Sequence, residues 1–201
     1  MRQYPRRTNP GVRNGEVQKK NRTDLSPHYN NYYQETPVVD RRRPGRGFKH
    51  LLRKSDVVSF LELLPDWEEL STGLDAVVLA PGNGDRQGWY GDGVVAVCAW
   101  PRELPQEYDD SFATDHRPLL DRLGVATSSR PKSKTLVHWT EATARAFQLL
   151  HVLLHELGHH HDRMTTKSRR ECSRGETYAE DYALRYADQI WDRYFQVFGG
   201  R

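Results

Sequence analysis

The sequence has few cysteines and no long apolar run. Its 201 residues include two cysteines, Cys98 and Cys172, too few for the disulfide framework that stabilises small secreted proteins. No stretch approaches the ~20 apolar residues that cross a bilayer, and the first residues lack the apolar core of a secretory signal. These absences argue against a membrane-spanning or secreted protein, and we expect a soluble, cytoplasmic one.

Positive charge is concentrated near the N-terminus. Residues 1–50 hold 12 Lys and Arg against 4 Asp and Glu, whereas residues 51–201 hold 18 against 23. Residues 1–46 have hardly any aliphatic side chains, so they cannot bury enough apolar surface to offset the entropy lost on ordering. We therefore expect a disordered basic arm over 1–46 and a folded domain over 47–201. The arm could bind an anionic partner such as a nucleic acid, although docking on the acidic domain of the same chain is favoured.

Beyond the arm, the residue pattern predicts a mixture of helices and strands. Four segments have the periodicity or composition of regular structure: a helix at 55–64, β-like runs at 75–80 and 93–100, and a strand at 136–139. Residues 81–92 are rich in turn-forming residues and are interpreted as a loop or a hairpin connection. Residues 101–134 look irregular apart from a short helix near 118–123, and could overhang a cleft.

His155, Glu156 and His159 form the pattern His-Glu-x-x-His inside an apolar-periodic run. On a helix, imidazoles at i and i+4 project from one face, so both can bind one zinc ion with Glu156 beside it. Such a zinc ion keeps a position for water and lowers its pKa toward ~7, and Glu156 would accept the proton. The local sequence supports a helix, since Thr140 can cap it and apolar residues recur at helical spacing, at Ala144, Phe147, Leu150, Leu154 and Leu157. The alternative is an amphipathic helix with partly exposed histidines.

This pattern resembles the active-site helix of the zincin metalloproteases, in which it supplies two zinc ligands and the catalytic glutamate. The metzincin branch adds a Gly and a third His, but those positions hold Asp162 and Thr165 here. No histidine follows His161, so a ligand further along the chain must be a carboxylate or Cys172. His160 and His161 are interpreted as solvated residues at the end of the helix.

Residues 175–187 predict a second helix that carries Glu176 and Glu180 on or beside its apolar stripe. This arrangement resembles the gluzincin pattern, in which a glutamate on a following helix binds zinc and an acidic residue four positions on orients a ligand histidine. The resemblance implies Glu176 as third ligand and Glu180 as the partner of His155 or His159. Ligand chemistry leaves other candidates for the third position: Glu180, Glu171, Asp181 and Cys172. Each of the two glutamates also completes a capping-box pattern, in which it would only bond backbone at a helix start.

Other side chains are candidates for contact with a substrate or with an oxyanion. His151 precedes His155 by one helical turn, although a core histidine bonded to backbone is the favoured interpretation. A positioned donor usually stabilises the transition state of peptide hydrolysis, and the residues that could supply one are Tyr178, Tyr182, Arg185 and His138. Sequence spacing does not choose among them.

Together these patterns predict an α+β, zincin-like domain in which a small mixed sheet packs on the His-Glu-x-x-His helix, followed by a C-terminal helix. The expected function is zinc-dependent peptide-bond hydrolysis with one Zn²⁺ per chain and Glu156 as the base. A peptide or protein substrate could pair with an edge strand, for which the valine-rich run at 93–100 is the candidate. The alternative is a non-catalytic nucleic-acid or protein interaction module with a structural or vestigial zinc site.

Overall fold

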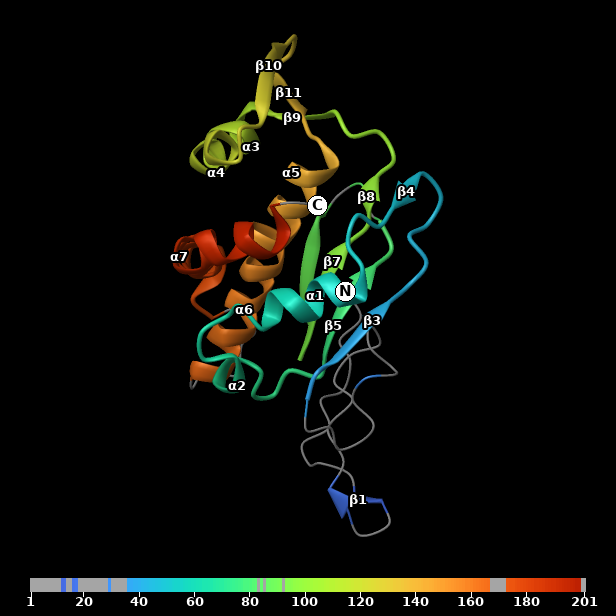
Figure 1. Cartoon of the computed structure of the whole chain (residues 1–201), viewed down its shortest axis with the longest axis vertical. Helices are drawn as coiled ribbons and strands as arrows, with labels where there is room; N and C mark the ends of the chain where they lie inside the picture. The colour runs from blue at the N-terminus through green and yellow to red at the C-terminus, as the bar shows by residue number, and fades with distance from the viewer. Residues whose placement is uncertain are drawn as a thin grey trace.

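A four-stranded sheet lies at the centre of the fold (Figure 1). The computed structural model describes residues 36–82, 84, 86–91, 93–166 and 173–199, together with Tyr29 and two short paired strands, β1 (Val12–Arg13) and β2 (Glu16–Val17). In the central sheet β3 (Val38–Arg41), β5 (Ala76–Ala80) and β7 (Val94–Cys98) are parallel, and β6 (Gly88–Gly91) pairs antiparallel with β7. The strand order is β3-β5-β7-β6.

Both faces of this sheet are covered, which explains the continuous apolar runs of β5 and β7. Every residue of these two strands is buried. Alternate side chains, including Val77 and Val97, join the main core with the helices, whereas Val78 and Ala96 join a smaller cluster that contains Tyr29. Strands buried on both faces are typically apolar throughout rather than alternating.

The strand arrangement corrects two expectations for residues 81–100. The runs at 75–80 and 93–100 are parallel neighbours, so 81–92 is not a hairpin connection between them; it contains β6, which pairs antiparallel with β7. The prediction that the run at 93–100 is an edge strand is also wrong, because β7 pairs with a strand on each side. In the described part of the chain, β6 is the end strand of the sheet. Sequence pattern does not reveal which neighbours a buried strand has.

The folded part begins earlier than the predicted boundary at residue 47. Strand β3 lies within the predicted arm and pairs in parallel with β5. Tyr29 is also buried, its hydroxyl hydrogen-bonds to Asp40, and Arg42 Nε donates to the Tyr29 hydroxyl at 3.1 Å. Val39 of β3 packs against the main core, and the backbone pairing with β5 completes this edge strand despite its polar surroundings. Except for β1, β2 and Tyr29, residues 1–35 lie outside the described residues. The expectation of a disordered arm concerns these residues and stays a prediction.

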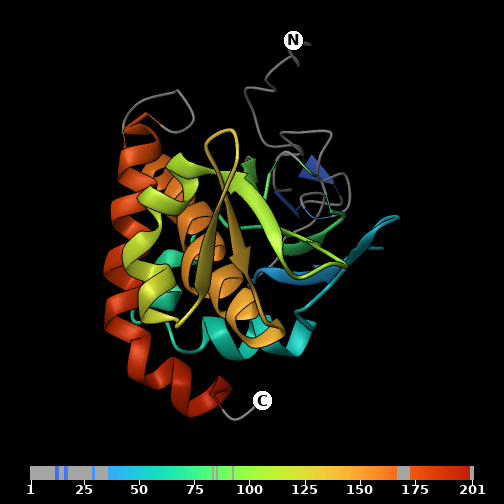
Figure 2. The ribbon, with the colours of Figure 1, turned by 90° about the horizontal axis from the view of Figure 1, so that it is seen from above.

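One long helix carries the His-Glu-x-x-His pattern. It runs through α5 (Glu141–Phe147), a π-helical stretch η1 (Gln148–Leu153) and α6 (Leu154–Thr165). As predicted, Thr140 caps it, since its hydroxyl accepts from the Thr143 backbone N–H at 3.1 Å. The C-terminal helix α7 (Gly175–Phe198) lies beside this long helix in both views (Figures 1 and 2). Two shorter helices, α1 (Lys54–Leu61) and α2 (Trp67–Leu70), precede β5.

Residues 101–134 are more regular than their sequence indicates. They contain β9 (Gln106–Asp109), α3 (Asp110–Asp115), α4 (Arg117–Arg122) and β10 (Ala126–Arg130). A three-stranded antiparallel sheet forms in the order β10-β11-β9, with β11 (Lys134–His138) at its centre. The short strands β4 (Phe48–Lys49) and β8 (Trp100–Pro101) form a further antiparallel pair.

The fold is thus mixed α/β with small sheets and a long C-terminal helix, as expected at this coarse level, whereas the zincin-like identity stays a prediction. Within the described ranges, no helix combines the length and the apolar composition needed to span a bilayer. The cytoplasmic location and the nucleic-acid partner stay predictions.

Candidate metal centre

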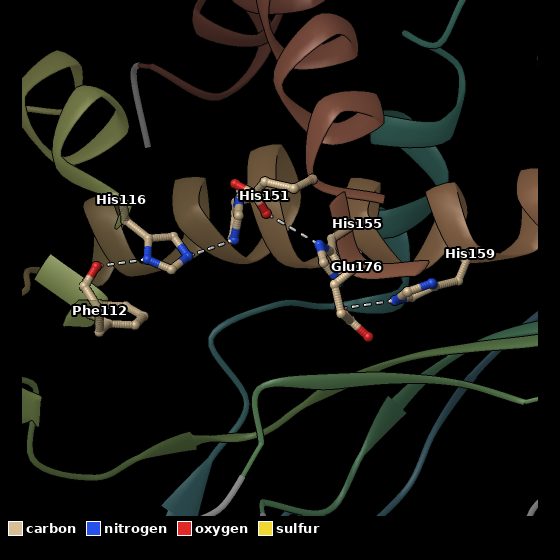
Figure 3. Close-up of polar contacts among 7 residues, drawn as sticks. Phe112, His116, His151, His155, His159 and Glu176 are labelled. Atoms are coloured by element: carbon tan, nitrogen blue, oxygen red, sulfur yellow. Dashed lines mark hydrogen bonds and ion pairs between the residues drawn. The ribbon is translucent and has the colours of Figure 1, made fainter. Parts of the chain in front are cut away.

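Three histidines lie on one side of the long helix (Figure 3). His151 is in η1, whereas His155 and His159 follow at one-turn intervals in α6. The ring centroids of His155 and His159 are 4.8 Å apart and their planes are nearly perpendicular, at 84°. The i, i+4 spacing therefore brings two imidazoles together, as helix geometry requires.

Glu176 of α7 lies across from this pair. Its Oε2 is 3.0 Å from His155 Nε2 and 3.4 Å from His159 Nε2. Ligand atoms around a tetrahedral zinc with bonds of about 2.0–2.1 Å are separated by ~3.3 Å, so both distances suit one ion between the three side chains. The three residues form one of two His and Glu clusters, among the described residues, whose ligand atoms all lie within 4.8 Å of one another.

The hydrogen bonds of His155 leave its Nε2 facing a carboxylate. His155 Nδ1 lies 3.3 Å from Glu180 Oε2 and donates to it, so a neutral imidazole presents a lone pair at Nε2. Glu176 has no proton to give when ionised, and two lone pairs that face each other need a proton or a cation between them. Burial acts to lower the pKa of His155, but the hydrogen bond to Glu180 and the neighbouring carboxylates outweigh it and raise the pKa. The donor set therefore fits a divalent cation, which would take the place of this proton.

Neither of the capping boxes suggested by the sequence forms at the start of α7. The residue before the helix is Arg174, and it makes no side-chain cap. The Ser173 hydroxyl instead bonds to Asp162 and Thr166, and the Glu176 side chain is 81% exposed in the cleft. Thr177 lies inside the helix, so it cannot cap it. Glu176 and Glu180 are thus free to face the histidines.

The Glu156 carboxyl lies in a tight, buried position beside the cluster. The residue is 8% exposed, and burial raises its pKa to about 7. A Cβ at Gly88 of β6 would lie 2.8 Å from Glu156 Oε1 and 2.7 Å from Val152 Cγ1. Only glycine therefore lets the edge strand approach the helix this closely.

A second close approach fixes α7 against α6. A Cβ at Gly158, the fourth residue of the pattern, would lie 2.9 Å from Ala179 Cα. At the end of α6, the fully buried carboxylate of Asp162 accepts from the Arg174 backbone N–H at 2.8 Å and from the Ser173 hydroxyl at 3.3 Å. Asp162 thus ties the end of one helix to the start of the other and sets where Glu176 emerges. The sequence carried a signal for it, since Asp162 is seven residues after His155 and shares its face.

The cluster borders a cavity of about 900 Å³. His155, Glu156 and Glu176 contribute polar groups to its wall. Its apolar lining comes from several elements, including β4, β8, β9 and α3, through Phe48, Trp100, Tyr108, Phe112 and Val152. Residues 101–134 therefore border the cleft, in line with the expectation that they overhang it.

Several other candidate residues lie away from this cavity. Tyr178 contacts His161 Nδ1 through its hydroxyl at 2.7 Å, and Tyr182 is buried against Gly158. Neither tyrosine lines the cavity, and the same holds for Arg185 and His138. His160 is 1% exposed and bonds to the Thr72 carbonyl at 3.0 Å, so its interpretation as a solvated residue is wrong.

His116, which the sequence did not single out, lies beside His151. The two Nε2 atoms are 2.9 Å apart, and His116 Nδ1 donates to the Phe112 carbonyl at 2.8 Å. His151 therefore has a side-chain partner rather than the backbone partner that the favoured interpretation gave it. The sequence gives no signal for this contact, because 35 residues separate the two histidines and no periodicity links them.

Within the described residues, none of the remaining candidate ligands belongs to the cluster of His155, His159 and Glu176. Asp181 lines the cavity without belonging to either cluster, and Glu171 and Cys172 lie outside the described residues. Comparison of the chain with protein-family models, with curated proteins and with solved structures found no match.

Proposed function

We propose that this chain is a zinc-dependent peptidase of the zincin type, in which His155, His159 and Glu176 hold the zinc ion. The observation that carries the proposal is the convergence of three lone-pair ligands from two helices, beside the buried carboxyl of Glu156 and at the wall of a large cavity. When bound, zinc would supply Lewis acidity that polarises a carbonyl and lowers the pKa of water toward ~7.

Glu156 acts as the general base and then as the general acid. Its carboxylate accepts a proton from the attacking water and passes that proton to the leaving amine. The close approach of β6 at Gly88 limits the space around the carboxyl, which reduces its reorganisation during the reaction. Glu180 orients the ring of His155 by accepting from its Nδ1, which keeps Nε2 directed toward the ligand cluster.

An extended peptide suits the surroundings of this site. Strand β6 is the end strand of the four-stranded sheet in the described part of the chain, and its Gly88 lines the cavity. A peptide could add to that edge by backbone hydrogen bonds, which bring its carbonyl groups past the ligand cluster. The aromatic lining of the cavity, with Trp100, Tyr108 and Phe112, would accept a bulky apolar side chain next to the cleaved bond.

The substitution Glu156→Gln tests this proposal. Glutamine keeps the shape of the side chain but cannot accept the proton, so cleavage should fall by roughly 10²–10⁴-fold while zinc content is unchanged. Cleavage is measured by mass spectrometry on a mixture of unstructured peptides, and zinc by elemental analysis of the full chain. Glu62→Gln, at an exposed position after α1, is the matched control and should alter neither.

Two outcomes would contradict the peptidase. Cleavage that survives Glu156→Gln would remove the proposed base. A wild-type chain that binds zinc and cleaves nothing in the mixture would favour the alternative, a non-catalytic interaction module.

A further inference from the structure

A second group of potential ligands lies in the same cavity. His116, His151 and Glu180 present ligand atoms that all lie within 4.8 Å of one another. All three side chains line the cavity, beside the cluster of His155, His159 and Glu176. Figure 3 shows His116 approaching His151 from outside the long helix.

The hydrogen bonds fix where the protons lie in this group. His116 Nδ1 faces the Phe112 carbonyl and must donate to it, so neutral His116 presents a lone pair at Nε2. His151 Nε2, 2.9 Å away, must then be the donor between the two rings, which leaves a lone pair at His151 Nδ1. That atom is 3.8 Å from Glu180 Oε1. The metal-free arrangement thus aims an imidazole lone pair at a carboxylate oxygen.

In the metal-free arrangement one proton lies between the two imidazoles, and His151 is 7% exposed. A divalent cation would take the place of that proton. A divalent cation satisfies the three ligand atoms together, because two imidazoles and a carboxylate are a common donor set for zinc and its first-row neighbours.

The surroundings of His116 are those of a metal ligand rather than of a surface histidine. Histidines that bind metals usually donate their other ring N–H to a carbonyl or carboxylate, as His116 does to Phe112. Its ring stacks on Phe112 at a centroid distance of 4.3 Å, and Phe112 stacks on Tyr108 at 4.0 Å. The stack holds the ring in place before any ion binds, which reduces the entropy lost on binding.

His151 lies in the π-helical stretch η1, a distortion frequently found at functional sites.

We propose that His116, His151 and Glu180 form a second divalent-cation site, separate from the zinc site of His155, His159 and Glu176. Glu180 connects the two sites, since one of its carboxylate oxygens faces His151 and the other accepts from His155. The second site has its own pair of histidines, so it does not require that the chain be a peptidase.

Zinc stoichiometry of the full-length chain tests the proposal. The metal-free chain is dialysed to equilibrium against micromolar ZnCl₂, and bound zinc is measured by elemental analysis in four forms: wild type, His116→Phe, His159→Ala and the double variant. Phenylalanine at 116 keeps an aromatic ring on Phe112, so the fold is retained. His138→Phe, the same change at an exposed histidine, is the matched control.

We expect two zinc ions per chain in the wild type and in His138→Phe, one in each single variant and none in the double variant. One ion in the wild type that is lost only in His159→Ala would overturn the second site and leave the peptidase proposal standing. One ion lost only in His116→Phe would support the second site and refute the first. Two ions that both remain in His116→Phe would place the extra ion elsewhere and overturn this inference.

Discussion

The substitution Gly158→Ala should weaken zinc binding more than it destabilises the fold. The added Cβ would lie 2.9 Å from Ala179 Cα and 3.1 Å from both Ala179 O and Tyr182 Cβ. Ordinary contacts are about 3.5–4.0 Å, so α7 must move away from α6 by roughly 0.5–1 Å. Two of the three atoms belong to the backbone of α7, and the helix therefore has to shift as a body.

Two effects on stability partly cancel. Overpacking a tight helix contact costs about 1–3 kcal/mol, whereas replacing Gly by Ala inside a helix contributes about 1 kcal/mol of propensity. The net loss in the free energy of unfolding is thus about 0–2 kcal/mol, measured by urea unfolding of the metal-free chain. Metal ligands tolerate displacements of only about 0.2 Å, and α7 carries Glu176, so zinc affinity should fall at least about tenfold.

Zinc affinity is measured by competition with a chromophoric chelator. Gly84→Ala is the control, because a Cβ there would meet nothing within 4 Å, and it should leave both quantities unchanged. Wild-type zinc affinity in Gly158→Ala would refute the argument that close helix packing positions the third ligand. A loss of stability well above 2 kcal/mol would refute the balance of the two energy terms.

Two further predictions concern the carboxylates. Glu180→Gln should lower the zinc affinity of the His155 site about 10–100-fold, because a weaker acceptor no longer orients His155; chelator competition in the His116→Phe background, which removes the second site, measures this, and equal affinities would contradict it. The second prediction concerns the metal-free chain. Burial raises the pKa of Glu156 to about 7 in the folded state, whereas its ordinary pKa of 4.5 applies in the unfolded state. The unfolded state therefore releases this proton first, so the stability of wild type relative to Glu156→Gln should fall by about 3 kcal/mol as the pH rises from 4.5 to 7. Parallel pH profiles in urea unfolding with zinc chelated would contradict this.

The sequence predicts best what one helix determines. The spacing of His155 and His159 needs only helical geometry to bring the rings together, and the burial of Leu154 and Leu157 in α6 follows from the same periodicity. Glu176 was harder to assign, because its position depends on how α7 packs against α6. The resemblance to the gluzincin pattern made it the first candidate, and the close contact at Gly158 explains why it reaches the histidines.

Long-range pairing is what local pattern could not supply. The run at 93–100 has the composition of any buried strand, and only its partners β5 and β6 make it central rather than an edge. His116 reaches His151 because β9 and α3 fold over the long helix, which no periodicity in residues 101–134 indicates. Asp162 is a different case, because its spacing of seven residues from His155 already places it on the same helix face.

The most direct test of the proposed metal centre is an anomalous-difference map at the zinc absorption edge, from crystals of the chain grown with zinc. We predict a peak about 2.0–2.2 Å from His155 Nε2, His159 Nε2 and a carboxylate oxygen of Glu176. A zinc-loaded crystal with no peak between these three side chains, or with one completed by a different carboxylate in place of Glu176, would contradict the account.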